Sequence, residues 1–177
     1  IVYENHTRNK ELLKYAQTDA LTGLYNKETT EQLTDELLSE DENKYHAFLI
    51  LDVDCFKQIN DIYGHAVGDI VLQKFGKLLK GTFREGDILG RIGGDEFGVI
   101  MKNIQTKDIA MKKAEELLVK LQAYMIDELK GNNISISIGI STAPQDGDCY
   151  MDLYKRADQA LYQAKRSGKA RVCNYFS

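Results

Sequence analysis

Residues 87–101 read DILGRIGGDEFGVIM, the most informative stretch of the sequence. Apolar residues lie on both sides of the pair Gly93-Gly94, which predicts two antiparallel strands joined by a tight turn, because glycine tolerates the positive φ angles that such turns demand. Asp95 and Glu96 follow at the tip, where the fold itself has no need of acids. Two carboxylates close to backbone suit a hard cation such as Mg²⁺. The stretch therefore predicts a β-hairpin with a metal site at its tip.

The rest of the chain predicts helices and strands that alternate around this hairpin. Helices are expected over 27–39, 56–63, 66–80, 106–129 and 150–167, strands over 45–51, 134–140 and 171–176, and a loop over 18–26. The continuous apolar run 45–51 is typical of a central strand covered on both faces. Isoleucines that alternate with small residues in 134–140 indicate a half-buried strand. With a hairpin embedded in this alternation, we expect an α+β fold with a mixed sheet.

The composition limits the classes of protein to consider. A chain of 177 residues with 43% apolar content fits one domain with a substantial core. A net charge of −4 gives no reason to expect binding to a nucleic-acid polymer or a membrane surface. Three scattered cysteines fit reduced thiols in the cytosol, and no apolar run approaches the roughly 20 residues of a membrane span. Phosphate-loop, dinucleotide-binding, zinc-protease and serine-hydrolase motifs are absent from the sequence.

A second group of acids lies where the run 45–51 ends, at Asp52-Val53-Asp54. Ligands of α/β sheets gather at such strand ends. Asp52 and Asp54 would point to the same face by the two-residue period of a strand, so both side chains become candidate metal ligands together with the hairpin acids. The alternative is that these acids cap the following helix.

Three polar side chains beyond this strand end suit a nucleotide. Lys57 could stabilise charge on a transferring phosphoryl group. The carboxylate of Asp69 could accept the two adjacent N–H groups of a guanine edge, and the amide of Asn60 could serve the remaining positions. The alternative is a solvated polar face. His65 is either structural or directed at a ligand.

A basic cluster follows the last expected helix and consists of Lys165, Arg166, Lys169 and Arg171. These cations could clamp phosphate, or they could complement the helix dipole and keep the chain soluble.

Four ordered motifs give the chain a family resemblance. It resembles the GGDEF domain of bacterial diguanylate cyclases in residues 93–97. Residues 19–26 (DALTGLYN) are similar to the family's opening motif, with Lys27 in place of the usual arginine. Residues 52–69 (DVDCFKQINDIYGHAVGD) match the next motif without a gap, and residues 157–165 (ADQALYQAK) match the late helix.

The resemblance implies a fold and a reaction. The fold would be the nucleotidyl-cyclase palm, an α+β domain whose mixed, mainly antiparallel sheet is flanked by helices. The reaction would condense two GTP into cyclic di-GMP with release of two pyrophosphates, in a homodimer with one GTP on each protomer. It would need Mg²⁺, with Mn²⁺ as a substitute.

The resemblance also implies how the domain is set in a longer protein. Because the chain begins with Ile1 rather than Met, we expect a fragment. Residues 1–17 would be a connector helix from an upstream sensor and residues 18–177 the GGDEF domain. The domain would be cytoplasmic, whether or not the parent protein has a membrane anchor.

The resemblance assigns roles by position in the motifs. The metal ligands would be Asp52, the carbonyl of Val53, Asp95 and Glu96; the catalytic residues Asp95, Lys57 and Glu96; and the substrate-binding residues Asn60, His65, Asp69, Lys165 and Lys169. Asp95 would also accept the proton. Here the Val53 carbonyl replaces the Asp54 side chain that the strand pattern favours.

A regulatory site is implied by Arg84 and Asp87, which form an R-x-x-D motif separated from Gly93 by five residues. The family's product-inhibition site has this motif at this spacing, so cyclic di-GMP would be an inhibitor as well as the product. Arginine suits bidentate capture of phosphate or of a guanine edge.

Two alternatives to a guanine-specific cyclase stay open. One is a catalytically silent receptor for GTP or cyclic di-GMP, although the acids and Lys57 that silent relatives usually lose are present. The other is an enzyme that makes adenine-containing dinucleotides. Asp69 opposes this second alternative, because a carboxylate matches guanine N–H donors and would repel the N1 acceptor of adenine.

Overall fold

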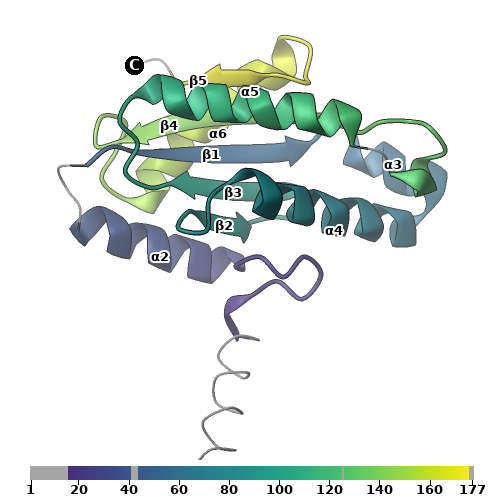
Figure 1. The fold of residues 1–177 in the computed structure, drawn as a ribbon, viewed down its shortest axis with the longest axis horizontal. Helices are drawn as coiled ribbons and strands as arrows, with labels where there is room; N and C mark the ends of the chain where they lie inside the picture. The colour runs from purple at the N-terminus through teal and green to yellow at the C-terminus, as the bar shows by residue number, and fades with distance from the viewer. Residues whose placement is uncertain (1–15, 41–43, 125, 176–177) are drawn as a thin grey trace, which may run out of the picture.

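The computed structural model describes residues 16–40, 44–124 and 126–175. Within these ranges five strands form one sheet in the order β2-β3-β1-β4-β5 (Figure 1). The strands are β1 (His46–Val53), β2 (Ile88–Arg91), β3 (Glu96–Met101), β4 (Ile136–Ala143) and β5 (Val172–Asn174). Neighbouring strands are antiparallel except β4 and β5, which are parallel. The predicted mixed, mainly antiparallel sheet is confirmed.

Helices cover both faces of this sheet, so the domain has three layers (Figure 1). The helices are α2 (Lys27–Glu40), α3 (Phe56–Tyr63), α4 (His65–Thr82), α5 (Lys107–Ala123) and α6 (Tyr150–Arg166). Helices α4 and α5 pack on one face, where Phe75 meets Phe97 edge to face at 4.9 Å between ring centroids. Helix α6 packs on the other face, where Tyr150 meets Phe48 in the same manner at 5.4 Å.

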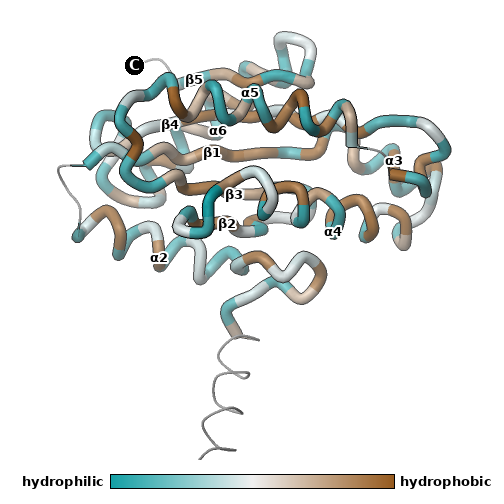
Figure 2. Tube along the Cα trace, viewed as in Figure 1, coloured by the Kyte–Doolittle hydropathy of each residue, from teal (hydrophilic) through white to brown (hydrophobic). Residues whose placement is uncertain are grey.

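The central strands owe their position to their apolar content. Figure 2 shows β1 and β3 as largely hydrophobic, whereas the helices alternate between hydrophobic and hydrophilic residues. Every residue of β1 is buried except Asp52, which is half-buried. The strand predicted from the apolar run 45–51 is therefore confirmed as a strand covered on both faces.

The helix predicted over 106–129 is shorter than expected. Helix α5 ends at Ala123, and a single 3₁₀ turn, Asp127–Leu129, follows. Ile126 and Leu129 are each 2% exposed and belong to the core. Because a straight helix has 3.6 residues per turn, it would turn Ile126 away from the buried stripe that includes Leu121, so the chain leaves the helix to bury both apolar residues.

The strand predicted to be half-buried, β4, is buried along its whole length. The alternating small residues face α6 rather than solvent. A Cβ on Gly139 would lie 2.0 Å from the carbonyl oxygen of Ala157, and the hydroxyl of Ser141 donates to the carbonyl of Leu153 at 2.8 Å. Small residues on this face therefore let the helix approach the sheet closely.

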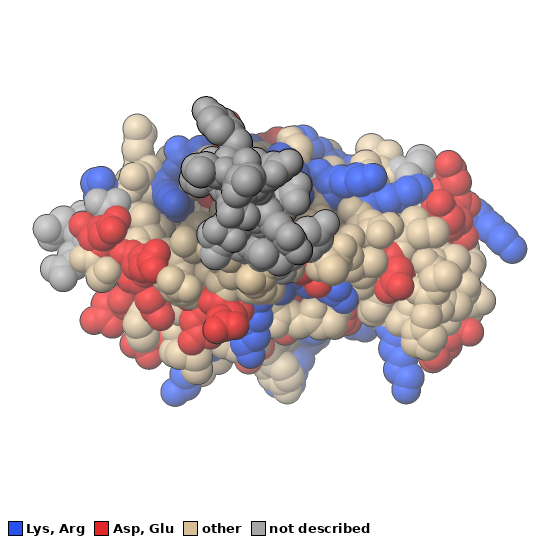
Figure 3. Space-filling model, turned by 90° about the horizontal axis from the view of Figure 1, so that it is seen from below, with Lys and Arg blue, Asp and Glu red and all other residues tan. Residues whose placement is uncertain are grey.

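The surface around α2 carries mixed charge. Seen from below, acidic side chains gather at the end of the molecule where α2 lies and also occur at the opposite end, with lysines and arginines interspersed (Figure 3). Among the described helices, none combines the length and apolar content needed to cross a membrane. The connector expected over 1–17 lies outside the described residues except for its last two positions.

Candidate functional site

The hairpin predicted within residues 87–101 is formed by β2 and β3. The N–H groups of Ile92 and Gly93 donate to the Glu96 carbonyl at 2.9 and 3.1 Å, which closes the turn. The expected reason for the glycine pair is wrong, because neither Gly93 nor Gly94 has a positive φ. A Cβ on Gly93 would lie 3.0 Å from the Cβ of Glu96, whereas one on Gly94 would meet nothing within 4 Å. Gly93 thus makes room for Glu96, and Gly94 leaves the tip open.

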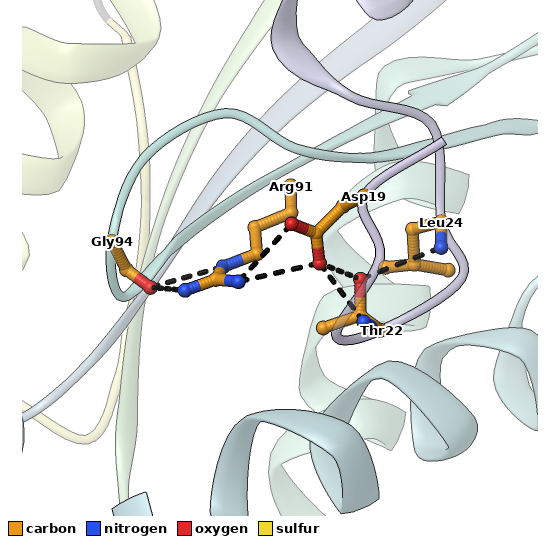
Figure 4. A network of polar contacts seen from close by, with 5 residues as sticks. All are labelled: Asp19, Thr22, Leu24, Arg91 and Gly94. Atoms are coloured by element: carbon orange, nitrogen blue, oxygen red, sulfur yellow. Dashed lines mark hydrogen bonds and ion pairs between the residues drawn. The ribbon is translucent and has the colours of Figure 1, made fainter. Parts of the chain in front are cut away.

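A polar network ties this tip to the loop before α2 (Figure 4). The Arg91 guanidinium donates to the carbonyl of Gly94 at 2.7 and 3.1 Å and to the carboxylate of Asp19 at 3.2 and 3.3 Å. Asp19 also accepts from the N–H and hydroxyl of Thr22, at 2.9 and 2.7 Å. Although burial alone would raise it, the pKa of Asp19 is lowered by these bonds from Thr22 and by the Arg91 charge. The opening motif therefore braces the hairpin tip through Arg91.

Asp52, at the end of β1, lies directly opposite Glu96 of β3. Its Oδ2 is 2.8 Å from Nζ of Lys165, which extends from α6. Burial raises the pKa of Asp52, and the pKa stays above its usual value although the Lys165 ammonium opposes this change. The negative charges of Asp95 and Asp54 add to the rise. The ionised carboxylate of Asp52 is therefore under-compensated by its surroundings.

Glu96 has a similar environment and a different partner. The hydroxyl of Tyr154, on α6, donates to Oε1 of Glu96 at 3.1 Å. Burial raises the pKa of Glu96, and the charges of Asp52 and Asp158 add to this rise against the opposing effect of the Tyr154 hydrogen bond. Burial and the Glu96 charge also raise the pKa of Tyr154 to about 12, so its hydroxyl keeps its proton.

The chemistry of these donors fits a divalent metal ion. Asp52, Asp95 and Glu96 offer oxygen ligands, and a bound cation would relieve the repulsion and desolvation that raise the pKa values of Asp52 and Glu96. The oxygens of these three residues do not all lie within 4.8 Å of one another. In the part of the chain that the structure describes, only Asp148, Cys149 and Asp152 bring three candidate ligand atoms this close together. Lys165 takes up one oxygen of Asp52 instead.

Asp54 has neither of the roles that the strand pattern suggested. Its side chain is buried and accepts from the hydroxyls of Ser135 and Ser137, at 2.8 and 2.7 Å, and from the N–H of Ala170 at 3.1 Å. The N-cap residue of α3 is Cys55, and no side chain caps this helix. Asp54 instead joins β1 to the segments around β4 and β5, and its oxygens are occupied by protein donors.

The residues expected to bind GTP lie on the neighbouring helices α3 and α4. Lys57, His65 and Asp69 are exposed, and Asn60 is half-buried. The amide of Asn60 lies against Gly68, where an added Cβ would come within 1.9 Å of Oδ1. This Oδ1 is buried and has no hydrogen-bond partner among the described residues. An orphaned polar atom next to Gly68, one residue before Asp69, is what a site made for a polar ligand would contain.

The basic cluster is divided among different partners. Lys165 pairs with Asp52, and Nζ of Lys169 is 3.0 Å from Sγ of Cys55. Arg166 lies over the ring of Tyr162, 5.7 Å from its centroid. Lys165 and Lys169 are therefore the members that reach the end of β1.

Arg84 and Asp87 lie beyond the opposite end of β2. Nε of Arg84 donates to Oδ1 of Asp87 at 3.0 Å, and the Lys102 N–H donates to the same oxygen at 3.1 Å. The Arg84 side chain is 59% exposed, whereas that of Asp87 is 2% exposed. Both residues line a cavity of about 520 Å³ together with Lys113.

The sequence interpretation missed Arg91, Asp19 and Tyr154. Arg91 and Asp19 are far apart in the chain, and no local pattern connects them. A signal for Tyr154 was present, because it lies eleven residues before Lys165 in the same helix. Eleven residues make about three turns, so both side chains lie on one face.

Comparisons with known proteins agree on one family. The family model described as "Diguanylate cyclase, GGDEF domain" matches residues 16–171. The chain is 38% identical over 171 residues to "Diguanylate cyclase A" of Treponema denticola, covering 93% of this chain and 46% of that protein. It is 37% identical over 177 residues to "Response regulator PleD" of Caulobacter vibrioides, covering 96% and 39%.

A solved structure is similar along almost the whole chain. The coiled coil and GGDEF domain of DgcB from Caulobacter crescentus, in complex with c-di-GMP, has a TM-score of 0.89 at 27% identity, covering 98% of this chain and 93% of that one. The chain spans less than half the length of the two relatives compared by sequence.

Proposed function

Because this chain belongs to the GGDEF domain family of diguanylate cyclases, we propose that it condenses two GTP into cyclic di-GMP and two pyrophosphates. The observation that carries the proposal is the pair Asp52 and Glu96, which face each other on neighbouring strands with raised pKa values. Two buried acids that their surroundings under-compensate lower the stability of the fold unless a bound ligand uses them.

The proposed metal ligands are Asp52, the carbonyl of Val53, Asp95 and Glu96. The Val53 N–H donates to the Asp95 carbonyl at 3.2 Å, which joins the end of β1 to the hairpin tip. Mg²⁺, or Mn²⁺ in its place, would activate the attacking hydroxyl and stabilise the leaving pyrophosphate. Lys165 would exchange its contact with Asp52 for one with substrate phosphate.

The proposed nucleotide contacts follow from the free polar atoms of α3 and α4. The carboxylate of Asp69 would accept hydrogen bonds from the N1–H and the amino group of guanine. The Asn60 amide, whose Oδ1 has no partner among the described residues, would serve the remaining edge of the base. His65 would contact the nucleotide, and the exposed Lys57 would stabilise charge on the phosphoryl group. Lys169 would assist Lys165 with phosphate.

The chemistry requires two protomers, each with one GTP. The 3′-oxygen of one GTP forms a bond to the α-phosphorus of the other while the bond from that phosphorus to the bridging oxygen of the β-phosphate breaks. Pyrophosphate leaves, and Asp95 accepts the proton of the hydroxyl. The same reaction between the 3′-oxygen of the second GTP and the α-phosphorus of the first closes the cyclic dinucleotide and releases the second pyrophosphate. A homodimer is therefore part of the proposal, as are a cytoplasmic setting and an upstream sensor that controls pairing.

A turnover assay with GTP and Mg²⁺, repeated over a range of protein concentrations, tests this function. We expect cyclic di-GMP as the product, a specific activity that rises with protein concentration, and loss of the product in Asp95→Asn. Undiminished product in Asp95→Asn would refute the metal assignment. Nucleotide binding without turnover at any protein concentration would favour the silent receptor, and adenine-containing product from equal ATP and GTP would refute the role of Asp69.

The cavity at Arg84 and Asp87 is proposed as the inhibitory site for cyclic di-GMP. Arg84 is exposed and can pair with phosphate or guanine, whereas Asp87 is buried and holds Arg84 in place. Lys113 adds a second cation to the cavity wall.

A further inference from the structure

Tyr154 is held in a fixed orientation by the aromatic side chains around it. Its ring stacks on Tyr150 with centroids 5.9 Å apart and an interplanar angle of 30°. Phe48 of β1 lies on another side, 6.5 Å between centroids. Because the ring is packed in this way, the direction of its hydroxyl is set by the core rather than by the surface.

The Tyr154 hydroxyl donates a hydrogen bond to one carboxylate oxygen of Glu96 and does not contact the other. Oε1 accepts from Tyr154 at 3.1 Å. Oε2 lies on the Gly93 side, where a Cβ added to Gly93 would come within 3.3 Å of it. The two oxygens of this carboxylate therefore have different surroundings: Oε1 is hydrogen-bonded to Tyr154 of α6, and Oε2 lies beside the hairpin turn.

Helix α6 holds both of the facing acids from one side. Tyr154 contacts Glu96, and Lys165, about three turns later on the same helix face, contacts Asp52. The two contacts differ in kind. Lys165 is a partly exposed cation that substrate phosphate can attract, whereas the Tyr154 hydroxyl is a neutral donor fixed by its ring.

We propose that Tyr154 is a positioning residue for Glu96: it retains Oε1, so that Glu96 offers the metal a single oxygen, Oε2, in a fixed place. This inference rests on the proposed function, since it takes Glu96 as a metal ligand. Groups that hydrogen-bond to a metal-ligating carboxylate commonly contribute ten- to a hundredfold to metal affinity.

The test compares Tyr154→Phe with Tyr150→Phe. Both remove one hydroxyl from the same aromatic stack, but the hydroxyl of Tyr150 is buried with no hydrogen-bond partner among the described residues. Binding of Mn²⁺ is measured by electron paramagnetic resonance in the presence of 3′-deoxy-GTP, which cannot react because it lacks the attacking hydroxyl. We expect the Mn²⁺ Kd to rise about tenfold in Tyr154→Phe and to stay within twofold of the native value in Tyr150→Phe.

Additional readouts separate a positioning role from a structural one. Melting temperatures of the two Phe variants should be within a few degrees of the native one. In steady state, Tyr154→Phe should need more Mg²⁺ for half-maximal rate and should recover most of its kcat at saturating Mg²⁺. Glu96→Gln should weaken Mn²⁺ binding, and adding Tyr154→Phe to it should have no further effect.

Several outcomes would overturn the proposal. These are equal Mn²⁺ affinity in Tyr154→Phe and the native chain, an equal loss in Tyr150→Phe, or no saturable Mn²⁺ binding by the native chain. The proposed function fails separately: if Mn²⁺ binds and the variants behave as expected but GTP gives no cyclic di-GMP, the role of Tyr154 stands without the cyclase activity.

Discussion

The end of β1 is bordered by two regions that differ in how well they compensate the buried carboxylates beside them. Toward β3 and α6, Asp52 and Glu96 have raised pKa values, because burial and repulsion from neighbouring acids exceed the opposing effects of Lys165 and Tyr154. Toward β4 and β5, Asp54 is more deeply buried but accepts three hydrogen bonds from Ser135, Ser137 and Ala170.

The two environments separate an acid that stabilises the fold from acids that are available to a ligand. A carboxylate with complete hydrogen bonds stabilises the native state, whereas an under-compensated one destabilises it until a cation binds. Two acids separated by one residue can therefore have opposite effects on stability.

The largest effect is expected for Asp52→Asn on activity. Loss of a charged metal ligand should lower the rate of cyclic di-GMP formation about a thousandfold, equivalent to roughly 4 kcal/mol of transition-state stabilisation. Product formation at saturating Mg²⁺ measures this. A loss of less than tenfold would show that Asp52 is dispensable for metal binding.

The same substitution should change how stability depends on pH. The pKa of Asp52 is raised in the folded state, so the native chain binds more protons than the unfolded chain between the ordinary Asp pKa of about 4 and the raised value. Stability should therefore fall as pH rises through this window, and Asp52→Asn should remove that part of the decline. Urea unfolding in EDTA at several pH values measures the difference, and parallel curves for the two proteins would contradict it.

Asp54→Ala tests the other region and should destabilise the fold by about 3 kcal/mol. It leaves the hydroxyls of Ser135 and Ser137 and the N–H of Ala170 without their acceptor. Urea unfolding near neutral pH gives the change in free energy. A cost below about 1 kcal/mol would mean that Asp54 is not the structural acid of the pair.

Much of the fold was predictable because its signals are local. The apolar run of β1 and the spacing within α4 and α6 are visible in the sequence. The errors arose where tertiary packing decides. Helix α5 stops early because Ile126 and Leu129 must reach the core, and β4 is buried because α6 covers its small residues.

The candidate site was predictable in its residue types and not in its contacts. Motif position indicated Asp52 and Glu96, but the strand pattern could not separate Asp52 from Asp54. That difference depends on Ser137 in β4 and Ala170 before β5, which only the folded chain brings to Asp54. For the same reason, the link between Arg91 and Asp19 carried no signal in the sequence.

Arg84→Ala extends the contrast to the far end of β2. Asp87 accepts two hydrogen bonds there, one from Arg84 and one from the Lys102 N–H, so it resembles Asp54. Loss of Arg84 leaves the buried carboxylate of Asp87 with one donor, so Arg84→Ala should lower the free energy of unfolding by about 1–2 kcal/mol. It should also raise the concentration of cyclic di-GMP needed for half inhibition at least tenfold, or roughly 1.4 kcal/mol. Unchanged inhibition would make the R-x-x-D motif incidental.

The smallest effect is expected at Ala170, whose N–H completes the bonds of Asp54. Ala170 has a φ of 50°, a left-handed conformation that costs a residue with a Cβ about 1 kcal/mol. Ala170→Gly should relieve this strain and raise the free energy of unfolding by up to about 1 kcal/mol, whereas Ala123→Gly, at the exposed end of α5 and without a positive φ, should lower it. If both variants lose stability, Ala170 does not adopt the left-handed conformation that directs its N–H to Asp54. The hydroxyls of Ser135 and Ser137 would then be the only donors that compensate the buried Asp54 carboxylate.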